Sequence, residues 1–234
     1  MKTITAFFLA LFTFQCSHTD QQIYLVFFDY SKSAATLEAG NKEKFMKHLN
    51  TIWTGMTAGE ELIIYPIHLL TETATSLLKI QKPEPKGDLN DSGNMKISKS
   101  KFSLLLKQKI FDQPDFPHAI TAGTNMYPIL RKIKRFQDNI YVSVLIVSDM
   151  KHDYLGESLD EIFGLKNKAL PKKLAEKKVD ALNLHSTLTN TNITIAIPGT
   201  YLGDREDELT RADIITYWEH IFTAAGSKLE VFDL

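Results

Sequence analysis

Short apolar runs alternate along this chain with longer amphipathic segments, and this alternation most limits the folds open to it. The apolar runs have the length and the β-branched and aromatic content of strands, whereas the amphipathic segments have helical periodicity. Strands are predicted at residues 22–28, 61–70, 140–147, 193–197 and 229–232, with a short antiparallel partner for the second at 75–80. Helices are predicted at 34–53, 100–111, 126–136, 158–163, 171–184 and 207–225.

Strands separated by helices indicate βαβ units, which build a mostly parallel sheet with helices on both faces. We therefore predict an α/β, doubly wound, Rossmann-like fold in a single domain over residues 20–234. Proline, glycine and asparagine over 81–99 indicate a polar loop, and a helical insertion is expected around 153–185. Pro66, inside the second predicted strand, indicates a position near a sheet edge or a bulge.

The composition is that of a soluble globular protein, large enough for one sizeable α/β domain or two small ones. The chain has 234 residues, of which 44% are hydrophobic, and its formal net charge is -1. With no overall basic field, binding to nucleic acid is not expected. A local group of lysines at 172, 173, 177 and 178 is interleaved with Glu176 and Asp180, which is typical of a solvated helix face.

The first residues have the pattern of an export signal. Lys2 precedes an apolar run at 4–14 that is too short to cross a bilayer, and polar residues follow from Ser17. We predict a signal peptide over 1–19 and a periplasmic or envelope location. Cys16, the only cysteine, has no partner for an internal disulfide. Its position resembles that of the lipidated cysteine of bacterial lipoproteins, which would tether the chain to a membrane; the alternative is an ordinary signal peptide whose cysteine is removed.

Oxygen-bearing side chains follow two of the predicted strands directly. Asp29, Ser31 and Ser33 come after the first strand, and Ser148 and Asp149 come after the strand at 140–147. In a doubly wound sheet, ligands bind at the carboxyl ends of strands where the strand order reverses. If these two strands are neighbours there, Asp29 and Asp149 face one another. Thr124, in a Gly-Thr-Asn turn ahead of a predicted helix, is a further candidate.

Together these side chains form a set of hard oxygen donors. Such donors favour Mg²⁺, or Mn²⁺, whereas a zinc site is not expected because no second cysteine and no suitably spaced histidine pair is available. A divalent cation would relieve the repulsion between two carboxylates. Hydroxyl ligands add no charge, so the metal would remain electrophilic enough to accept a carboxylate from outside.

The Asp29-x-Ser31-x-Ser33 motif, Thr124 in its turn, and Ser148-Asp149 resemble the metal-ion-dependent adhesion site (MIDAS) of the von Willebrand factor A (vWA) domain, in residue type and in chain order. The resemblance implies a vWA fold and a protein–protein interaction module without enzymatic activity. It further implies direct metal binding by Ser31 and Ser33, largely water-mediated binding by Asp29 and Asp149, and conformation-dependent binding by Thr124. The last metal position would take an acidic side chain of a partner protein.

Two other functions compete with this interpretation. A strand ending in aspartate also resembles phosphotransferases of the haloacid dehalogenase type, so the alternative is a metal-dependent hydrolase or phosphotransferase using Asp29. That chemistry needs a second carboxylate two residues on, where this chain has Ser31. The third possibility is a degenerate scaffold that no longer binds metal.

Each candidate also has a purely structural interpretation. Asp29, Ser31 and Thr124 can act as turn or helix-capping residues. His68 and His220 are expected to be packing or surface residues, and Lys151, His152 and Asp153 to be exposed and solvated.

Overall fold

The computed structural model describes residues 22–31, 39–84, 91–112, 123–136, 140–154, 157–158, 171–198 and 211–233. Among them a six-stranded sheet runs in the order β3-β2-β1-β4-β7-β8. Its strands are β1 (Gln22–Asp29), β2 (Glu61–Ile67), β3 (Leu78–Gln81), β4 (Tyr141–Val147), β7 (Thr191–Ile197) and β8 (Lys228–Asp233). Every pairing is parallel except that of β2 with β3. The predicted doubly wound α/β fold is thus confirmed, including the short antiparallel strand.

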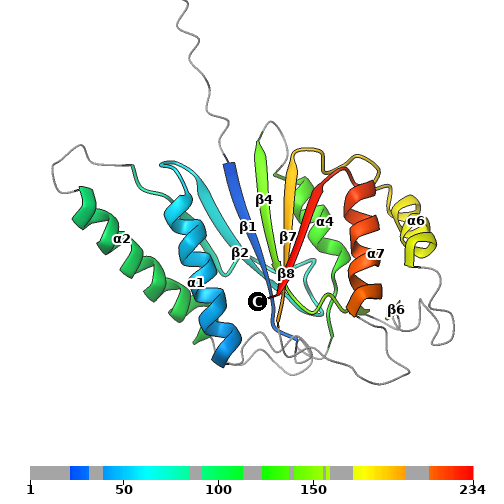
Figure 1. Cartoon of the computed structure of the whole chain (residues 1–234), viewed down its shortest axis with the longest axis horizontal. Helices are drawn as coiled ribbons and strands as arrows, with labels where there is room; N and C mark the ends of the chain where they lie inside the picture. The colour runs from blue at the N-terminus through cyan, green and yellow to red at the C-terminus, as the bar shows by residue number, and fades with distance from the viewer. Residues whose placement is uncertain are drawn as a thin grey trace, which may run out of the picture.

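Helices cover both faces of this sheet (Figure 1). One face carries α1 (Ala39–Gly55) and α2 (Asp91–Leu106), which continues into the π-helical turn η1 (Lys107–Phe111). The other carries α4 (Tyr127–Lys134), α6 (Pro171–Leu182) and α7 (Arg211–Ala224). Of the helices that the structure describes, none is both long and apolar enough to cross a membrane.

Strand β1 lies inside the sheet and is buried on both faces. Leu25 and Phe27 belong to the core under α4, α6 and α7, whereas Val26 and Phe28 belong to the core under α1 and α2. All four side chains are fully buried. This explains the continuous apolar run in the sequence, since side chains alternate between faces along a strand.

The prediction of a polar loop at 81–99 is wrong over its second half, because α2 begins at Asp91. The residues that suggested a loop include Asp91 and Ser92, which are also favoured at the start of a helix. The helix packs through Phe102, whose ring stacks on Trp53 of α1 with centroids 4.6 Å apart. Residues 85–90 lie outside the described part of the chain.

The insertion expected around 153–185 is helical only in part. It opens with a two-stranded antiparallel pair, β5 (Asp153–Tyr154) and β6 (Glu157–Ser158), so Ser158 starts no helix. Helix α6 confirms the predicted second half. The rest of the helix predicted at 158–163, the start of the one at 207–225, and the predicted signal peptide with Cys16 lie outside the described residues.

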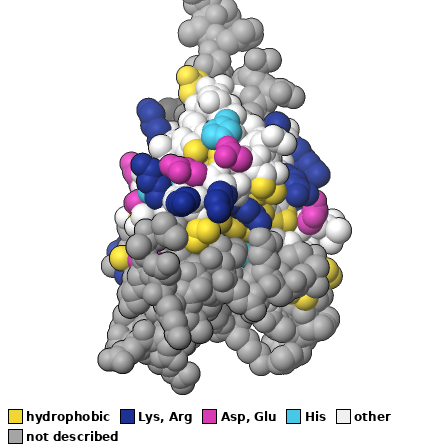
Figure 2. All heavy atoms as spheres, turned by 90° about the vertical axis from the view of Figure 1, so that its right-hand side faces the viewer, with side chains coloured by type: hydrophobic (Ala, Val, Ile, Leu, Met, Phe, Trp, Pro, Cys, Tyr) yellow, Lys and Arg dark blue, Asp and Glu magenta, His cyan; other side chains and the backbone are white. Residues whose placement is uncertain are grey.

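One smaller expectation is confirmed and a second holds in part. Strand β3 pairs with β2 only as far as Ile64, so Pro66 lies where β2 has β1 on one side and no β3 on the other. On α6, Lys172, Lys173 and Lys177 are exposed, as expected of a solvated face, whereas Lys178 is half-buried with its Nζ 4.2 Å from the centroid of the Tyr127 ring. Figure 2 shows Lys and Arg side chains over this side of the molecule, with acidic side chains among them.

Candidate metal centre

Asp29 is the last residue of β1, and its carboxylate is completely buried. Its Oδ1 accepts a hydrogen bond from the Ser31 backbone N–H at 2.8 Å. Its Oδ2 accepts one from the Ser148 hydroxyl at 2.5 Å. Strands β1 and β4 pair up to Phe28 and Val147, so the residues that follow them emerge side by side, as predicted. Hydrogen bonds from residues that follow β1 and β4 therefore hold the carboxylate in place.

The turn after β4 holds Asp149 in place through short-range hydrogen bonds. The Ser148 hydroxyl accepts from the Met150 N–H at 2.9 Å, and Asp149 Oδ1 accepts from the Lys151 N–H at 3.0 Å. Met150 adopts a φ of 61°, in the left-handed region that favours glycine. The Trp218 indole of α7 donates to the Met150 carbonyl at 2.9 Å, which holds this strained backbone against the core.

The two aspartates interact electrostatically. Burial, and secondly the negative charge of Asp149, raise the pKa of Asp29 to about 7. Hydrogen bonds from Ser148 and Ser31 lower it and only partly offset these effects. A carboxyl group with such a pKa is poised between a neutral and a charged state at neutral pH. The fold therefore holds the two acidic groups close enough for the charge of Asp149 to oppose the ionisation of Asp29.

Thr124 lies at the same edge of the sheet, in a segment anchored to the ends of β2 and β4. The Asn125 N–H donates to the carbonyl of His68, which directly follows β2, at 3.3 Å. The Met126 N–H donates to His152 Nδ1, in the loop after β4, at 3.2 Å. Thr124 itself is 2% exposed. The structure thus places four of the five predicted residues, Asp29, Ser31, Thr124 and Asp149, at one edge, and Ser33 lies outside the described residues.

His152 corrects one expectation, because it is buried and not solvated. Its side chain is 2% exposed, and its ring lies 4.5 Å, between centroids, from that of Tyr127. It joins the loop that carries Asp149 to the segment that carries Thr124. His68, in contrast, is a buried packing residue as expected, and its Nδ1 accepts from the Leu70 N–H at 2.9 Å.

Ser148 is a second residue whose role the sequence did not reveal. It was recognised as a neighbour of Asp149, yet it bonds to Asp29 on the adjacent strand. One sequence feature could have predicted this contact: Ser148 directly follows Val147, at the carboxyl end of its strand.

The donor set fits a hard divalent cation. Among the described residues, no three His, Cys, Asp or Glu side chains gather at one point. A centre here would therefore combine two carboxylates with hydroxyl groups and water, as Mg²⁺ and Mn²⁺ accept. The raised pKa of Asp29 supports this fit, because a nearby cation would favour the charged carboxylate.

Comparison with known proteins gives distant structural likenesses only. No family model matches the chain, and no curated protein matches it. Among solved structures, it is similar to a von Willebrand factor type A protein from Catenulispora acidiphila, with a TM-score of 0.47 and 10% identity over 91% of this chain and 39% of the other. The ArnB paralog VWA2 from Sulfolobus acidocaldarius gives a TM-score of 0.46 and 11% identity, over 90% of this chain and 41% of the other.

A third similar structure is proximal thread matrix protein 1 from the mussel byssus, described as having a zinc-occupied MIDAS motif. Its TM-score is 0.42 and its identity 11%, over 88% of this chain and 48% of the other. The chain spans less than half the length of each of these structures. Likenesses this distant carry no argument, so the fold class rests on the strand order and pairing given above.

Proposed function

We propose that this chain is a divalent-metal-dependent protein-interaction module with a site of the MIDAS type. The observation that carries the proposal is the buried pair Asp29 and Asp149, held at adjacent strand ends, where the charge of Asp149 opposes the ionisation of Asp29. Such a pair destabilises the metal-free protein, and a divalent cation would relieve the repulsion. The order of the motif residues along the chain supports the same conclusion.

The proposed metal ligands are Asp29, Ser31, Ser33, Thr124 and Asp149. Ser148 would keep the Asp29 carboxylate oriented, since its hydroxyl donates to Oδ2. His152 would hold the Thr124 segment near the Asp149 loop, since it accepts the Met126 N–H. When bound, Mg²⁺ or Mn²⁺ would supply an electrophilic centre for an acidic side chain of a partner protein. We further propose that the chain is exported and acts in the bacterial envelope, with a membrane tether if Cys16 is lipidated.

Thermal unfolding with and without metal tests the proposed site. Mg²⁺ or Mn²⁺ at 10 mM, with a Kd of about 0.1–1 mM, would stabilise the fold by about 1.4–2.7 kcal/mol and raise Tm by roughly 3–11 °C. Asp29→Ala should lose this response. Asp180→Asn is the matched control, because Asp180 is exposed on α6 and pairs only at the surface with His185. An unchanged Tm of the wild type in millimolar metal would contradict the proposal.

Partner binding and catalysis need separate measurements. A pull-down from an envelope extract should retain a partner in Mg²⁺, lose it in a chelator, and lose it with Asp29→Ala. Metal-dependent hydrolysis of a generic phosphoester, abolished by Asp29→Asn, would instead establish the enzymatic alternative.

For the location, cell fractionation should find the wild type in the membrane fraction and Cys16→Ser released from it, if the cysteine is lipidated.

A further inference from the structure

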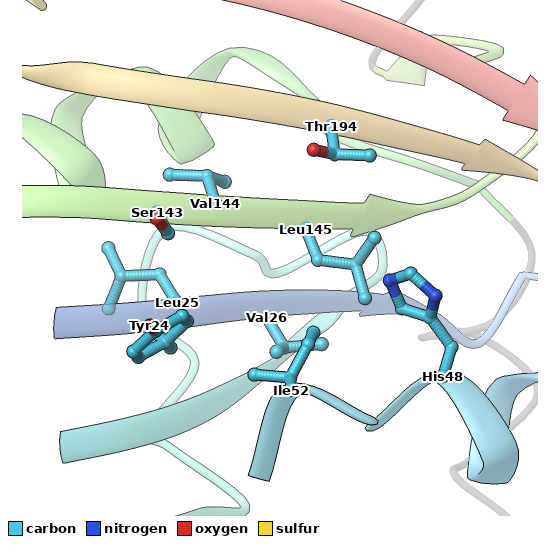
Figure 3. A pocket seen from close by; sticks show the side chains of 9 residues that line it. All are labelled: Tyr24, Leu25, Val26, His48, Ile52, Ser143, Val144, Leu145 and Thr194. Atoms are coloured by element: carbon cyan, nitrogen blue, oxygen red, sulfur yellow. The ribbon is translucent and has the colours of Figure 1, made fainter. Parts of the chain in front are cut away.

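A small pocket lies on the α1 face of the sheet, away from the candidate metal centre (Figure 3). Its floor is formed by β1, β4 and β7, and one wall by His48 and Ile52 of α1. It reaches Tyr24 and Ser143 in the first halves of their strands, whereas Asp29 ends β1. Its volume is about 140 Å³. The pocket is thus a separate feature of the fold.

The pocket exists because helices cover this face of the sheet unevenly. The pairing places Val26, Leu145, Thr194 and Glu230 in one row across β1, β4, β7 and β8. Along this row the side chains change from buried and apolar to exposed and charged. In the next row, Asn192 and Lys228 are also exposed. The polar side chains show that the sequence encodes a water-facing surface over β7 and β8, at the border of which the pocket opens.

The side chains that line the pocket define the kind of molecule it can take. Val26, Leu145 and Ile52 provide an aliphatic surface. Tyr24, Ser143 and Thr194 carry hydroxyl groups, of which that of Ser143 already accepts a hydrogen bond from the side-chain amide of Gln22. None of the lining residues is a lysine, arginine, aspartate or glutamate, and burial lowers the pKa of His48, which disfavours the charged form of its imidazole.

Size narrows the choice further. A protein cavity of about 150 Å³ holds one benzene molecule, so a pocket of this volume takes a single six-membered ring. An aliphatic surface with hydroxyl groups at its border suits a ring with one hydrogen-bonding substituent. A charged ligand would lose its hydration without meeting an opposite charge. We propose that this pocket binds uncharged single-ring molecules that carry a hydroxyl group, independently of the metal centre.

The test is an NMR titration of the full chain with phenol, compared with benzoate as a charged molecule of similar size. Phenol should shift amide signals of residues 24–26, 48, 52, 143–145 and 194, with a Kd on the order of 1–10 mM as expected for so small a ligand. Benzoate should bind at least about tenfold more weakly than phenol. Chelator should change neither result. Equal binding of benzoate, or no shift of these signals at 20 mM phenol, would overturn the proposal.

A matched pair of variants on β7 and β8 locates the site. Thr194→Phe places a ring in the pocket and should weaken phenol binding about tenfold. Lys228→Phe places the same ring on the exposed face of β8, two strands away from the pocket-lining Ser143, and should leave binding unchanged. Thermal unfolding checks that both variants fold, and Ser143→Leu replaces Thr194→Phe if that variant does not. Equal phenol binding by the wild type and a folded pocket variant would also overturn the proposal.

Discussion

At the scale of single residues, Asp29 combines complete burial with a nearby carboxylate of the same charge. Because its pKa in the fold, about 7, lies above the ordinary aspartate pKa of 3.8, the folded state holds its proton over a pH range in which the unfolded chain has lost it. Stability of the metal-free protein should therefore fall as the pH rises from about 4 to about 7 and level off above that. This slope belongs to Asp29 and should disappear when the residue cannot ionise.

Asp29→Asn tests this. At pH 8 in chelator, the variant should be more stable than the wild type by an amount on the order of 4 kcal/mol, because it removes a buried charge. Towards pH 4 the difference should shrink, since Asp29 is then neutral in the folded state and increasingly protonated in the unfolded chain, where its pKa is 3.8. Urea unfolding between pH 4 and 8.5 measures this. If the stability of the wild type instead rose with pH in parallel with that of Asp29→Asn, the raised pKa of Asp29 would be contradicted.

Ser148→Ala separates the orientation of Asp29 from its charge. The variant loses a hydrogen bond to Asp29 Oδ2 and one from the Met150 N–H, both buried, and should cost about 1–3 kcal/mol. Because the Ser148 hydroxyl lowers the pKa of Asp29, its loss should raise that pKa further and weaken metal binding. Thermal unfolding with and without Mg²⁺ checks both. Ser148→Thr, which keeps the hydroxyl, should recover most of the metal response.

Residue types revealed the candidate ligands, but not how their neighbours pack. The sequence predicted Asp29 and Asp149 at one edge because the rules for parallel sheets place strand ends there. It missed the burial of His152, because that depends on the Tyr127 ring and the Met126 N–H, which come from a distant segment. Hydrogen bonds between segments far apart in the chain leave no periodic signal.

At the scale of elements, the sequence predicts the strands well, whereas it predicts α2 only from residue 100 onwards and misses its start at Asp91. Strand β1 shows a plain apolar run because it is buried on both faces, whereas the first turn of α2 carries Ser92, Gly93 and Asn94, which are also typical of loops. Helices cover the sheet unevenly, and the sequence of β7 indicates this, because Asn192 and Thr194 alternate with isoleucines along the strand. Such alternation is typical of a strand with one solvated face.

Helix α2 provides its own test. Phe102 is fully buried against Trp53, so Phe102→Ala should cost about 3–5 kcal/mol. Leu104, on the same helix, is 54% exposed, and Leu104→Ala should change stability by less than about 0.5 kcal/mol. Urea unfolding compares them. Equal and small effects would mean that α2 does not pack on α1.

At the scale of the whole molecule, protons and metal should compete for the same edge of the sheet. Lowering the pH below about 7 neutralises Asp29, so the rise in Tm that Mg²⁺ causes should shrink from pH 8 to pH 5.5. The metal-free protein should show the opposite trend and gain stability over the same interval. Thermal unfolding across pH with and without metal measures both. A metal effect independent of pH would place the cation away from Asp29.

The position of β1 in the sheet also bears on how the chain folds. It is the first described strand in the sequence, yet it pairs with β4, which comes about half the chain later. Asp29 and Asp149 meet only when β4 docks, so their repulsion opposes a step that already requires closure of a long loop. A cation held between them would act on that step, and the rate of sheet assembly would then depend on the ions in the compartment where the chain folds.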